Sequence, residues 1–375
     1  MKCIDEVPDS ELKGKRVLVR SDFNVPIGKG GEVADRYRIE RGWKTLQYLR
    51  KRGAKVVIIS HIGREREESL EPVARVLKEF GPVVFIADIV GPAARGAVSA
   101  MRKGDMLMLE NLRRDLRETE NDPSFAKELA SFADIYVDDA FAAAHRAHAS
   151  IVGVAKLLPS YAGLLVCDEV REIDAAREPE HPSFAILGGA KFETKAPLIK
   201  LLLEKYDNVF ITGALANDVF KARGLPVGHS LISKELPSED IHTSPRFLAP
   251  IDVTAEDKSG HAKVKKPEEV GDDERIVDAG PDTVAMLVPL IAQAKFILWN
   301  GPTGIYEEGY NHYTQQIAEL AAGSKAKIVI GGGDTIAAIE ATGVPKEKLG
   351  FLSTGGGAML EYLLKGTLPG IEVLK

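Results

Sequence analysis

Short apolar segments rich in valine and isoleucine alternate along this chain with longer amphipathic segments. The apolar runs read RVLV, KVVIIS, PVVFIA, MLMLE and DIYVDD in the first half of the chain and SFAIL, NVFITG, KFILWN and KIVIGGG in the second. Between them, apolar residues recur at helical spacing, as at Ile39, Trp43 and Leu46. Strands that are apolar throughout and are each followed by a helix form parallel sheets covered on both faces. The pattern therefore predicts an α/β fold with doubly wound parallel sheets.

The length of the chain predicts two such domains. Its 375 residues exceed what one hydrophobic core usually serves. We expect the boundary at CDEVREIDAAREPEHPSF, where a charged segment that favours a helix runs into Pro179 and Pro182 before the next apolar run. The expected organisation is a first domain over residues 1–167, a helical linker over 168–182, and a second domain that begins at residue 183.

Composition narrows the class of protein. The chain is 45% hydrophobic and 28% charged, as soluble globular proteins are. No segment reaches the roughly 18 apolar residues of a membrane span, and the first residues lack the apolar core of a secretory signal. We therefore expect a cytoplasmic protein. Cys3 and Cys167 stand far apart in the sequence without metal-ligand or CxxC spacing, so we expect both to be inert.

Positive charge is distributed unevenly between the two halves. Residues 1–165 hold 27 Lys and Arg against 24 Asp and Glu, whereas the remainder holds 22 against 31. Sixteen of the 21 arginines lie in the first part. Arginine can bind a carboxylate or phosphate with two hydrogen bonds, whereas lysine acts as a point charge. The first half therefore favours a small ligand with several negative charges, with solvated surface charge as the ordinary alternative.

Charged and polar residues follow the apolar runs of the first half, where ligands bind in open parallel sheets. These residues are Arg20, Asp22, Asn24, His61, Arg64, Arg113, His145, Arg146 and His148. Two alternatives remain open at this point. Asp22 and Asn24 could shape a turn before Pro26. The pair His145 and His148 could bind a metal, which the neighbouring arginines and the lack of a third ligand disfavour.

Glycines and lysines take the corresponding places in the second half. The segments after the apolar runs read LGGAKFETK, ITGALAN, WNGPTGIYEEG, IGGGDT and STGGGA. Glycines let backbone N–H groups reach phosphate oxygens at a helix N-terminus, and Lys191 and Lys195 can lie against phosphates. None of these loops is a Walker A loop or a GxGxxG fingerprint followed by an acidic residue. The pattern predicts a nucleotide site of another kind.

The motifs taken together indicate a family. RSDFNVP, SHIGR, LENLR, DDAFAAAHRAH, LGGAKFETK, LWNGPTGIYE, IGGGDT and STGGGA follow one another over nearly the whole chain, and they resemble those of phosphoglycerate kinase. The resemblance implies two similar α/β domains that face each other across a cleft. It implies that the first domain binds phosphoglycerate, that residues 183–355 form the nucleotide-binding domain, and that a C-terminal helix and tail, 356–375, return to the first domain.

The resemblance also implies the reaction and its ligands. The reaction is the reversible transfer of a phosphoryl group from 1,3-bisphosphoglycerate to Mg-ADP, which gives 3-phosphoglycerate and ATP. Alignment and positive charge are the main needs of such a transfer, and an arginine-rich domain with a glycine- and lysine-rich domain supplies both. We expect Mg²⁺ with ADP or ATP, a monomer, and no nucleic-acid or membrane partner. The STGGG glycines would then let backbone amides approach the moving phosphate, with a hinge as their secondary role.

The residues that match the family's functional positions fall into three groups. The triose-binding positions are Asp22, Phe23, Asn24, Arg38, His61, Ile62, Gly63, Arg64, Arg113 and Arg146. The nucleotide-binding positions are Lys195, Gly213, Glu307, Gly332, Gly333, Asp334 and Thr335. The catalytic positions are Arg38, Lys191, Gly355 and Gly356. Asp334 would act through the Mg²⁺ ion.

Two departures and three alternatives stand beside this interpretation. Ser21 replaces the family's usual valine, and Gly213 is followed by Ala214 where many members have a longer glycine run, which leaves the adenine contacts open. A dinucleotide-dependent dehydrogenase would need the fingerprint that is absent. A non-catalytic member that only binds nucleotide would be expected to lose a residue such as Lys191, and none is lost. A nucleic-acid binder would need a basic surface, which the net charge of −6 disfavours.

Overall fold

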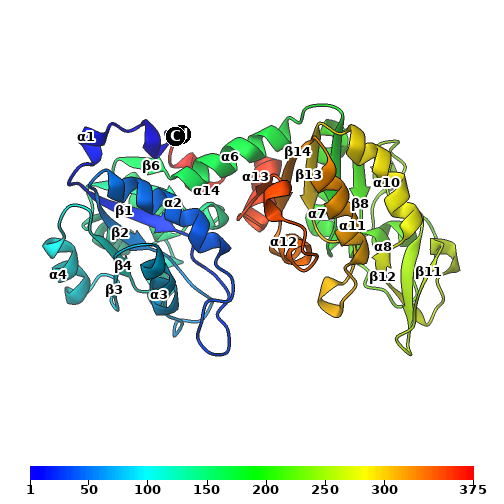
Figure 1. Ribbon diagram of the computed structural model, residues 1–375, viewed down its shortest axis with the longest axis horizontal. Helices are drawn as coiled ribbons and strands as arrows, with labels where there is room; N and C mark the ends of the chain where they lie inside the picture. Colours follow the sequence, from blue (N-terminus) through cyan, green and yellow to red (C-terminus); the bar gives the residue numbers. More distant parts are fainter. The chain divides into compact units, whose positions relative to one another are not determined.

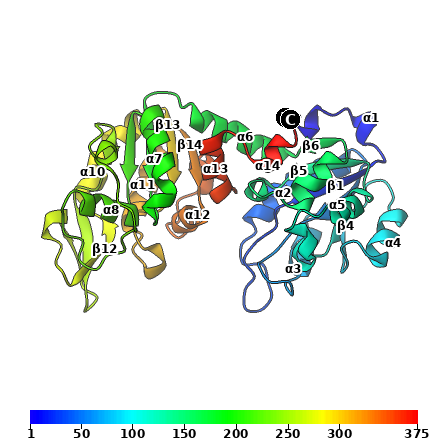
Figure 2. The same ribbon diagram turned by 180° about the vertical axis from the view of Figure 1, so that it is seen from behind.

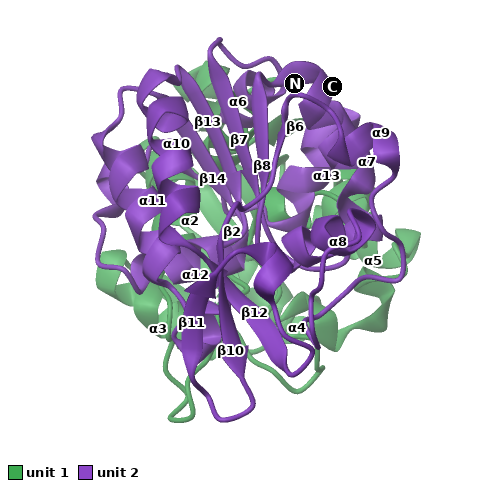
Figure 3. Cartoon of the chain, turned by 90° about the vertical axis from the view of Figure 1, so that its right-hand side faces the viewer, with its two compact units in different colours: residues 1–171, 367–375 green, residues 172–366 purple.

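The chain folds into two compact units. The computed structural model describes all 375 residues. Unit 1 consists of Met1–Arg171 and Thr367–Lys375, and unit 2 is Glu172–Gly366 (Figure 3). The helix α6, Leu164–Arg177, runs from one unit into the other. Compared with the linker expected over residues 168–182, this helix begins four residues earlier and ends five residues earlier.

A six-stranded parallel sheet forms the centre of unit 1. Its strands lie in the order β3-β4-β2-β1-β5-β6. They are β1 (Arg16–Ser21), β2 (Lys55–Ile59), β3 (Val83–Ile86), β4 (Met106–Leu109), β5 (Ile135–Asp139) and β6 (Ser160–Ala162). The helices are α1 (Asp9–Leu12), α2 (Tyr37–Lys51), α3 (Glu71–Phe80), α4 (Pro92–Ala100), α5 (Pro123–Ala130) and α14 (Pro369–Glu372). The helices α2 and α3 cover one face of this sheet (Figure 1), and α5 covers the other (Figure 2).

A second parallel sheet forms the centre of unit 2, in the order β15-β14-β13-β7-β8-β9. Its strands are β7 (Ser183–Leu187), β8 (Asn208–Ile211), β9 (Phe247–Leu248), β13 (Phe296–Asn300), β14 (Lys327–Gly331) and β15 (Phe351–Leu352). The helices are α7 (Phe192–Lys205), α8 (Ala214–Ala222), α9 (Glu239–His242), α10 (Pro281–Gln293), α11 (His312–Gly323), α12 (Gly333–Glu340) and α13 (Gly357–Lys365). The helices α10 and α11 lie on one face (Figure 1), and α7 and α13 lie on the other (Figure 2).

Burial on both faces explains why the strands were visible in the sequence. Every residue of β4, β5, β7 and β13 is buried, so none of these strands needs a polar face. Both sheets therefore confirm the predicted α/β class with helices on each side. None of the helices is both long and apolar enough to cross a bilayer.

A small antiparallel sheet in unit 2 was not predicted. Its strands are β10 (Val253–Asp257), β11 (Ala262–Lys265) and β12 (Glu274–Ala279), in the order β11-β10-β12. Figure 3 shows this sheet beyond one end of the six-stranded sheet. Three of the four residues of β11 are exposed, so the segment lacks the continuous apolar run that marks the other strands. The charged residues on these strands are more typical of a loop than of a buried strand.

The C-terminal segment divides at Gly366 instead of returning as a whole. The helix α13 packs against α7 and belongs to unit 2, whereas the prediction joined it to the returning residues 356–375. The tail beyond it does return to unit 1, where Gly370 N donates to Ala144 O (2.8 Å). A Cβ at position 370 would lie 3.0 Å from the Ala144 Cα atom, so glycine allows this close contact.

The two cysteines form a disulfide, so the prediction that both are inert was wrong. The Cα atoms of Cys3 and Cys167 lie 6.2 Å apart, although 164 positions separate them in the sequence. The reason lies in the topology of unit 1. Cys3 pairs as an isolated parallel bridge with Ala162 at the end of β6, and α6 begins two residues after that strand. Sequence spacing carries no information on such a contact.

Candidate active site

Polar side chains at the ends of β1 and β2 form a hydrogen-bonded cluster in unit 1. Arg38, in the first turn of α2, donates from Nη1 to Asp22 Oδ2 (2.8 Å) and to the Asn24 carbonyl (3.3 Å). Asn24 Oδ1 accepts a hydrogen bond from Gly63 N (2.9 Å). Burial acts to raise the pKa of Asp22, but the neighbouring positive charges, Arg38 first, outweigh it and lower that pKa. Asp22 is thus a buried carboxylate that fixes the guanidinium of Arg38.

His61 lies beside this cluster as a neutral side chain. It is 4% exposed, and its Nδ1 atom is 3.1 Å from Arg20 Nη2. Burial, and then the charge of Arg20, place the pKa of His61 well below its ordinary value, although Asp22 acts in the opposite direction. Because the guanidinium can only donate, Nδ1 accepts and the proton of the imidazole lies on Nε2.

Three arginines converge on a cavity of ≈ 580 Å³ beyond these strand ends. The cavity is lined by Asn24, Gly63, Arg64, Arg113, Thr119, Arg146 and His148. Burial, and then the charge of Arg146, lower the pKa of Arg113. Burial and the neighbouring arginines lower the pKa of His148 to about 4. Such mutual repulsion marks a region of positive potential, which a ligand with several negative charges would neutralise.

Two of the expected triose-binding residues have their side chains in the core instead. Phe23 and Ile62 are at most 1% exposed and belong to the hydrophobic core of unit 1. Their backbone amides are also engaged, because Phe23 N donates to Ser60 Oγ (2.9 Å) and Ile62 N donates to Asn111 Oδ1 (3.2 Å). The contacts of both residues hold the loops that carry Asn24 and the neighbouring site residues.

A buried polar network lies behind the cavity, and sequence patterns did not reveal it. Arg20 is fully buried and donates from Nε to Ser150 Oγ (2.9 Å). Ser150 in turn donates from Oγ and from its backbone N to the two carboxylate oxygens of Glu118, at 2.6 and 2.9 Å. Of its members, only Arg20 was named from the sequence, by its place at the end of an apolar run. Glu118 and Ser150 lie in short 3-10 and π-helical segments far along the chain, so their positions carry no local signal.

In unit 2 the two predicted lysines lie where the loop after β7 enters α7, with Lys195 in the first turn of the helix. Lys191, directly before α7, has φ 66° and ψ 77°, a left-handed conformation that residues with a side chain rarely adopt. Its side chain is exposed, whereas Lys195 donates from Nζ to Gly188 O and to Asn300 Oδ1 (3.1 Å). Burial lowers the pKa of Lys195 to about 8, and the charge of Asp334 offsets this only in part.

Asn300, at the end of β13, links this lysine to the glycine loop after β14. Its Nδ2 atom donates to Gly331 O (2.7 Å). Gly332 has φ 100°, and a Cβ there would lie 2.8 Å from Asn300 Nδ2. The hydroxyl of Thr335 donates to Gly331 O (2.9 Å) and accepts from Gly301 N (2.6 Å). Asn300 and Thr335 therefore hold the loops in place, and Asn300 was missed although it directly ends an apolar run.

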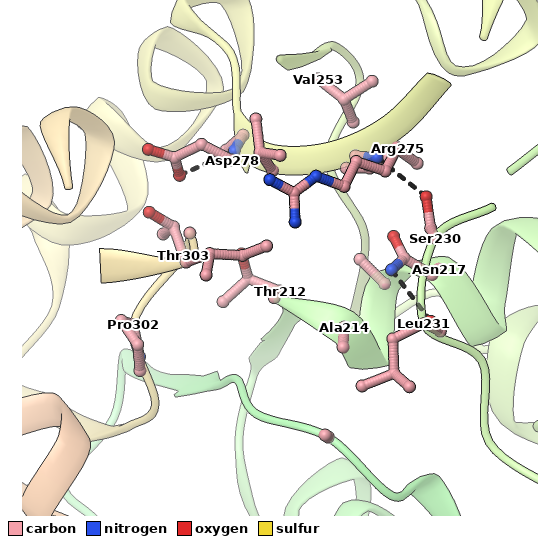
Figure 4. A pocket seen from close by; sticks show the side chains of 18 of the residues that line it. Thr212, Ala214, Asn217, Ser230, Leu231, Val253, Arg275, Asp278, Pro302 and Thr303 are labelled. Carbon is pink, nitrogen blue, oxygen red and sulfur yellow. Dashed lines mark hydrogen bonds between the residues drawn. The ribbon is translucent and has the colours of Figure 1, made fainter. Parts of the chain in front are cut away.

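A pocket of ≈ 620 Å³ lies beyond the ends of β7, β8 and β13 (Figure 4). Of the expected nucleotide-binding residues, Gly213, Glu307 and Asp334 line it, and Lys195, Gly332, Gly333 and Thr335 do not. Gly213 has φ 62°, and a Cβ there would lie 3.1 Å from Gly189 N, so glycine lets the two loops come together. Other lining residues were not predicted and include Thr212, Asn217, Arg275, Asp278 and Thr303 (Figure 4).

The unpredicted part of the pocket wall has unsatisfied polar atoms. Thr212 Oγ1 and Asn217 Oδ1 are buried and have no hydrogen-bond partner within the protein. Asn217 Nδ2 donates to Leu231 O (3.1 Å), which fixes the orientation of the amide. Burial raises the pKa of Asp278 to about 6. Unpaired buried polar atoms in a pocket wall are typical of groups that bind water or a ligand.

The glycine loop after β15 leads into α13. Gly356 has φ 47° and ψ −113° directly before the helix, and a Cβ there would meet no atom within 4 Å. Gly355 N donates to Ser353 Oγ (3.0 Å), which shapes the loop from within. Open space beside the backbone, together with a conformation that favours glycine, agrees with a loop that a ligand approaches.

The carboxylate of Asp334 in unit 2 suits a magnesium ion that binds together with the phosphates of a nucleotide. Mg²⁺ prefers oxygen ligands and is commonly held by one or two carboxylates together with substrate phosphates. Asp334 provides an exposed carboxylate in the pocket wall, in the first turn of α12. Cys3, Asp5 and Glu6 also lie close together in unit 1, but the sulfur of Cys3 is held in the disulfide.

Comparison with known proteins identifies the family. A family model described as phosphoglycerate kinase matches residues 7–366. The chain belongs to the phosphoglycerate kinase family. Phosphoglycerate kinase of Leptospira biflexa is 43% identical over 385 aligned positions, which cover 98% of this chain and 97% of that one. The enzyme of Moorella thermoacetica is 42% identical, with 98% of each chain covered.

Solved structures of the same family superpose on the chain. Phosphoglycerate kinase from Coxiella burnetii matches with a TM-score of 0.84 at 35% identity, over 99% of this chain and 98% of that one. The enzyme from Pyrococcus horikoshii OT3 matches with a TM-score of 0.88 at 29% identity, over 100% and 98%. These matches confirm the resemblance found in the motifs, the fold, and the enzyme class, a phosphotransferase with a carboxyl group as acceptor. The roles of individual residues stay predictions.

Proposed function

We propose that this kinase transfers a phosphoryl group reversibly between 1,3-bisphosphoglycerate and Mg-ADP through two half-sites, one in each unit. The observation that carries the proposal is the presence of an arginine-lined cavity at the strand ends of unit 1 and a glycine-lined pocket at the strand ends of unit 2. Phosphoryl transfer depends mainly on alignment and on stabilisation of negative charge. The cavity suits the triose, and the pocket suits the nucleotide.

In unit 1 three arginines bind the substrate, and a fourth, Arg38, acts on the transferred group. Arg64, Arg113 and Arg146 bind the phosphate of 3-phosphoglycerate, because their crowded positive charges are relieved by an anion. Arg38 stabilises charge on the transferred group, and its hydrogen bond to Asp22 fixes the guanidinium in position before the substrate binds. His61 is neutral and buried, so it acts as a hydrogen-bond donor to the triose through Nε2–H and not as a general acid.

In unit 2 the loops bind the nucleotide. Lys195 and the loop from Gly332 to Thr335 hold its phosphates, and Glu307 binds the ribose. Lys191, together with the backbone at Gly355 and Gly356, stabilises the moving phosphoryl group. Asp334 would hold Mg²⁺ together with the phosphates, and the ion would supply charge neutralisation. The support is the position of Gly213, Glu307 and Asp334 in one pocket wall.

A coupled assay with 3-phosphoglycerate and Mg-ATP tests the activity. Well-folded protein should turn over, and chelation of Mg²⁺ should stop it. No turnover by folded protein would contradict the catalytic function and leave the non-catalytic alternative.

Two matched variants test the assignment of the half-sites. Arg113→Ala should raise the KM for 3-phosphoglycerate by about tenfold or more, because a charge-assisted hydrogen bond is lost, and should leave the KM for ATP unchanged. Lys195→Ala should do the reverse. If either variant changes the KM of both substrates equally, the assignment is wrong.

The remaining partner predictions concern the whole protein. We propose a cytoplasmic monomer that binds small molecules and neither nucleic acid nor membrane; the net charge of −6 disfavours binding to these anionic partners. Light scattering coupled to size exclusion would show one chain per particle. A dimer at micromolar concentration would contradict the monomer.

A further inference from the structure

The short turn that carries Glu307 has little packing of its own. It is η8, Tyr306–Glu308, a single 3-10 turn in which no residue is buried. Gly309 ends it with φ 90°, in the left-handed region. A three-residue exposed turn is not fixed by burial, so contacts from elsewhere must set the direction of its side chains.

Those contacts come from the small antiparallel sheet. Ile305 N, just before the turn, donates to Val277 O of β12 (2.9 Å). Tyr310, just after it, donates from its hydroxyl to Glu256 Oε1 of β10 (2.5 Å). The turn is therefore tied to the sheet at both ends.

Arg275 of β12 makes the third tie, and it holds the turn itself. Its Nη2 atom donates to Glu308 Oε2 (2.6 Å) and its Nη1 atom to Glu308 Oε1 (3.3 Å). Its Nε atom donates to Glu256 Oε2 (2.7 Å), from the residue directly opposite in the β10–β12 register. One guanidinium thus joins two carboxylates, one of them through a two-point contact. Its side chain is 32% exposed and lines the pocket (Figure 4).

We propose that Arg275 is a positioning residue for the nucleotide ribose: it anchors Glu308, and thereby aims the adjacent Glu307 into the pocket. The inference rests on the proposed function of Glu307 as the ribose-binding residue. Without the guanidinium, Glu256 and Glu308 would repel each other across the gap that Arg275 now bridges. The turn would then move away from the sheet and carry Glu307 with it.

The structure offers a matched control on the same sheet. Lys265 of β11 donates from Nζ to both carboxylate oxygens of Glu274 on β12, each at 2.7 Å. This pair is less exposed than the Arg275 cluster, at 19% and 15%, and it does not touch η8. Lys265→Met therefore weakens the sheet without releasing the turn.

The test uses the full chain and compares ATP with 2′-deoxy-ATP and 3′-deoxy-ATP in the coupled assay. The wild type should prefer ATP to at least one analogue by about tenfold in kcat/KM, the effect of one hydrogen bond to a charged group. In Arg275→Met the KM for ATP should rise by about the same factor, with kcat and the KM for 3-phosphoglycerate within about twofold, and the preference for ATP should disappear. Arg275→Lys should restore part of it, since one ammonium cannot make the two-point contact. Lys265→Met should behave as the wild type does.

Glu307→Gln separates failure of this inference from failure of the proposed function. If Glu307→Gln removes the preference for ATP and Arg275→Met does not, Glu307 binds the ribose and the positioning role of Arg275 is wrong. If Arg275→Met weakens the binding of ATP and of both analogues by the same factor, Arg275 acts on another part of the nucleotide and the inference is also overturned. If Glu307→Gln leaves the preference intact, the ribose assignment fails and the inference with it, while turnover of the wild type still supports the kinase.

Discussion

At the scale of single residues, Arg38 is held by a buried carboxylate and not only by its place on α2. Arg38→Ala should lower kcat by about a hundredfold or more, because it removes a preorganised charge that acts chiefly in the transition state. Binding of 3-phosphoglycerate should stay within several-fold. Arg38→Lys should recover only part of kcat, since lysine lacks the two-armed guanidinium.

Arg36 provides the control for this prediction. It lies two positions earlier, is exposed, and pairs with Glu79 at 2.6 Å, away from Asp22. Arg36→Ala should leave kcat unchanged. Steady-state kinetics and calorimetry on both variants check the outcome, and a near-normal kcat with only a raised KM in Arg38→Ala would make Arg38 a simple binding residue.

Lys195 gives the nucleotide site a pH dependence. Because burial lowers its pKa to about 8, the free enzyme loses this positive charge as the pH rises past that value. The KM for ATP should therefore rise above about pH 8 in the wild type. Lys195→Arg keeps its charge throughout this range, so its KM for ATP should stay flat. Parallel profiles for the two proteins would show that another group titrates.

At the scale of elements, Asp139 at the end of β5 contacts the start of α6, and its carboxyl group is neutral in the folded protein. Burial raises the pKa of Asp139 to about 8, and hydrogen bonds from Thr45 and the Leu165 backbone lower it only in part. An aspartate in the unfolded chain has a pKa of about 3.9. Between pH about 4 and about 8, the unfolded chain has therefore released a proton that the folded chain still holds. The free energy of unfolding should fall through this window as pH rises, by at most about 1.4 kcal/mol per pH unit from this group.

Asp139→Asn should make this dependence less steep, because the amide does not titrate, and should be more stable than the wild type near pH 8. Asp272 is exposed, and Asp272→Asn serves as the control with the wild-type slope. Urea unfolding at several pH values measures the slopes. An Asp139→Asn variant that loses stability with pH as steeply as the wild type would show that Asp139 is ionised in the folded protein.

At the scale of the whole molecule, the disulfide closes a large loop that contains most of unit 1. Linking Cys3 to Cys167 removes conformational entropy from the unfolded chain, and the loss of such a link typically costs about 2–5 kcal/mol. Cys3→Ser should therefore lower the urea midpoint, and dithiothreitol should lower that of the wild type to the same value. Dithiothreitol should not change the midpoint of the variant. Two free thiols in the denatured, unreduced wild type would contradict the bond.

The sequence by itself determined the two parallel sheets, because their strands are buried on both faces and so appear as unbroken apolar runs. It also predicted site residues at strand ends, because parallel strands bring their carboxyl ends to one edge, and two of these residues, Asn24 and Asp334, line the two cavities. Only the tertiary structure decided the contacts between distant segments. The Cys3–Cys167 bond, the network of Glu118, and the tie of Arg275 to Glu308 depend on which turns meet, and no local pattern of polarity encodes that. The antiparallel sheet was also not predicted from the sequence. Its reason is different: its exposed strands need no apolar face and so leave no apolar run.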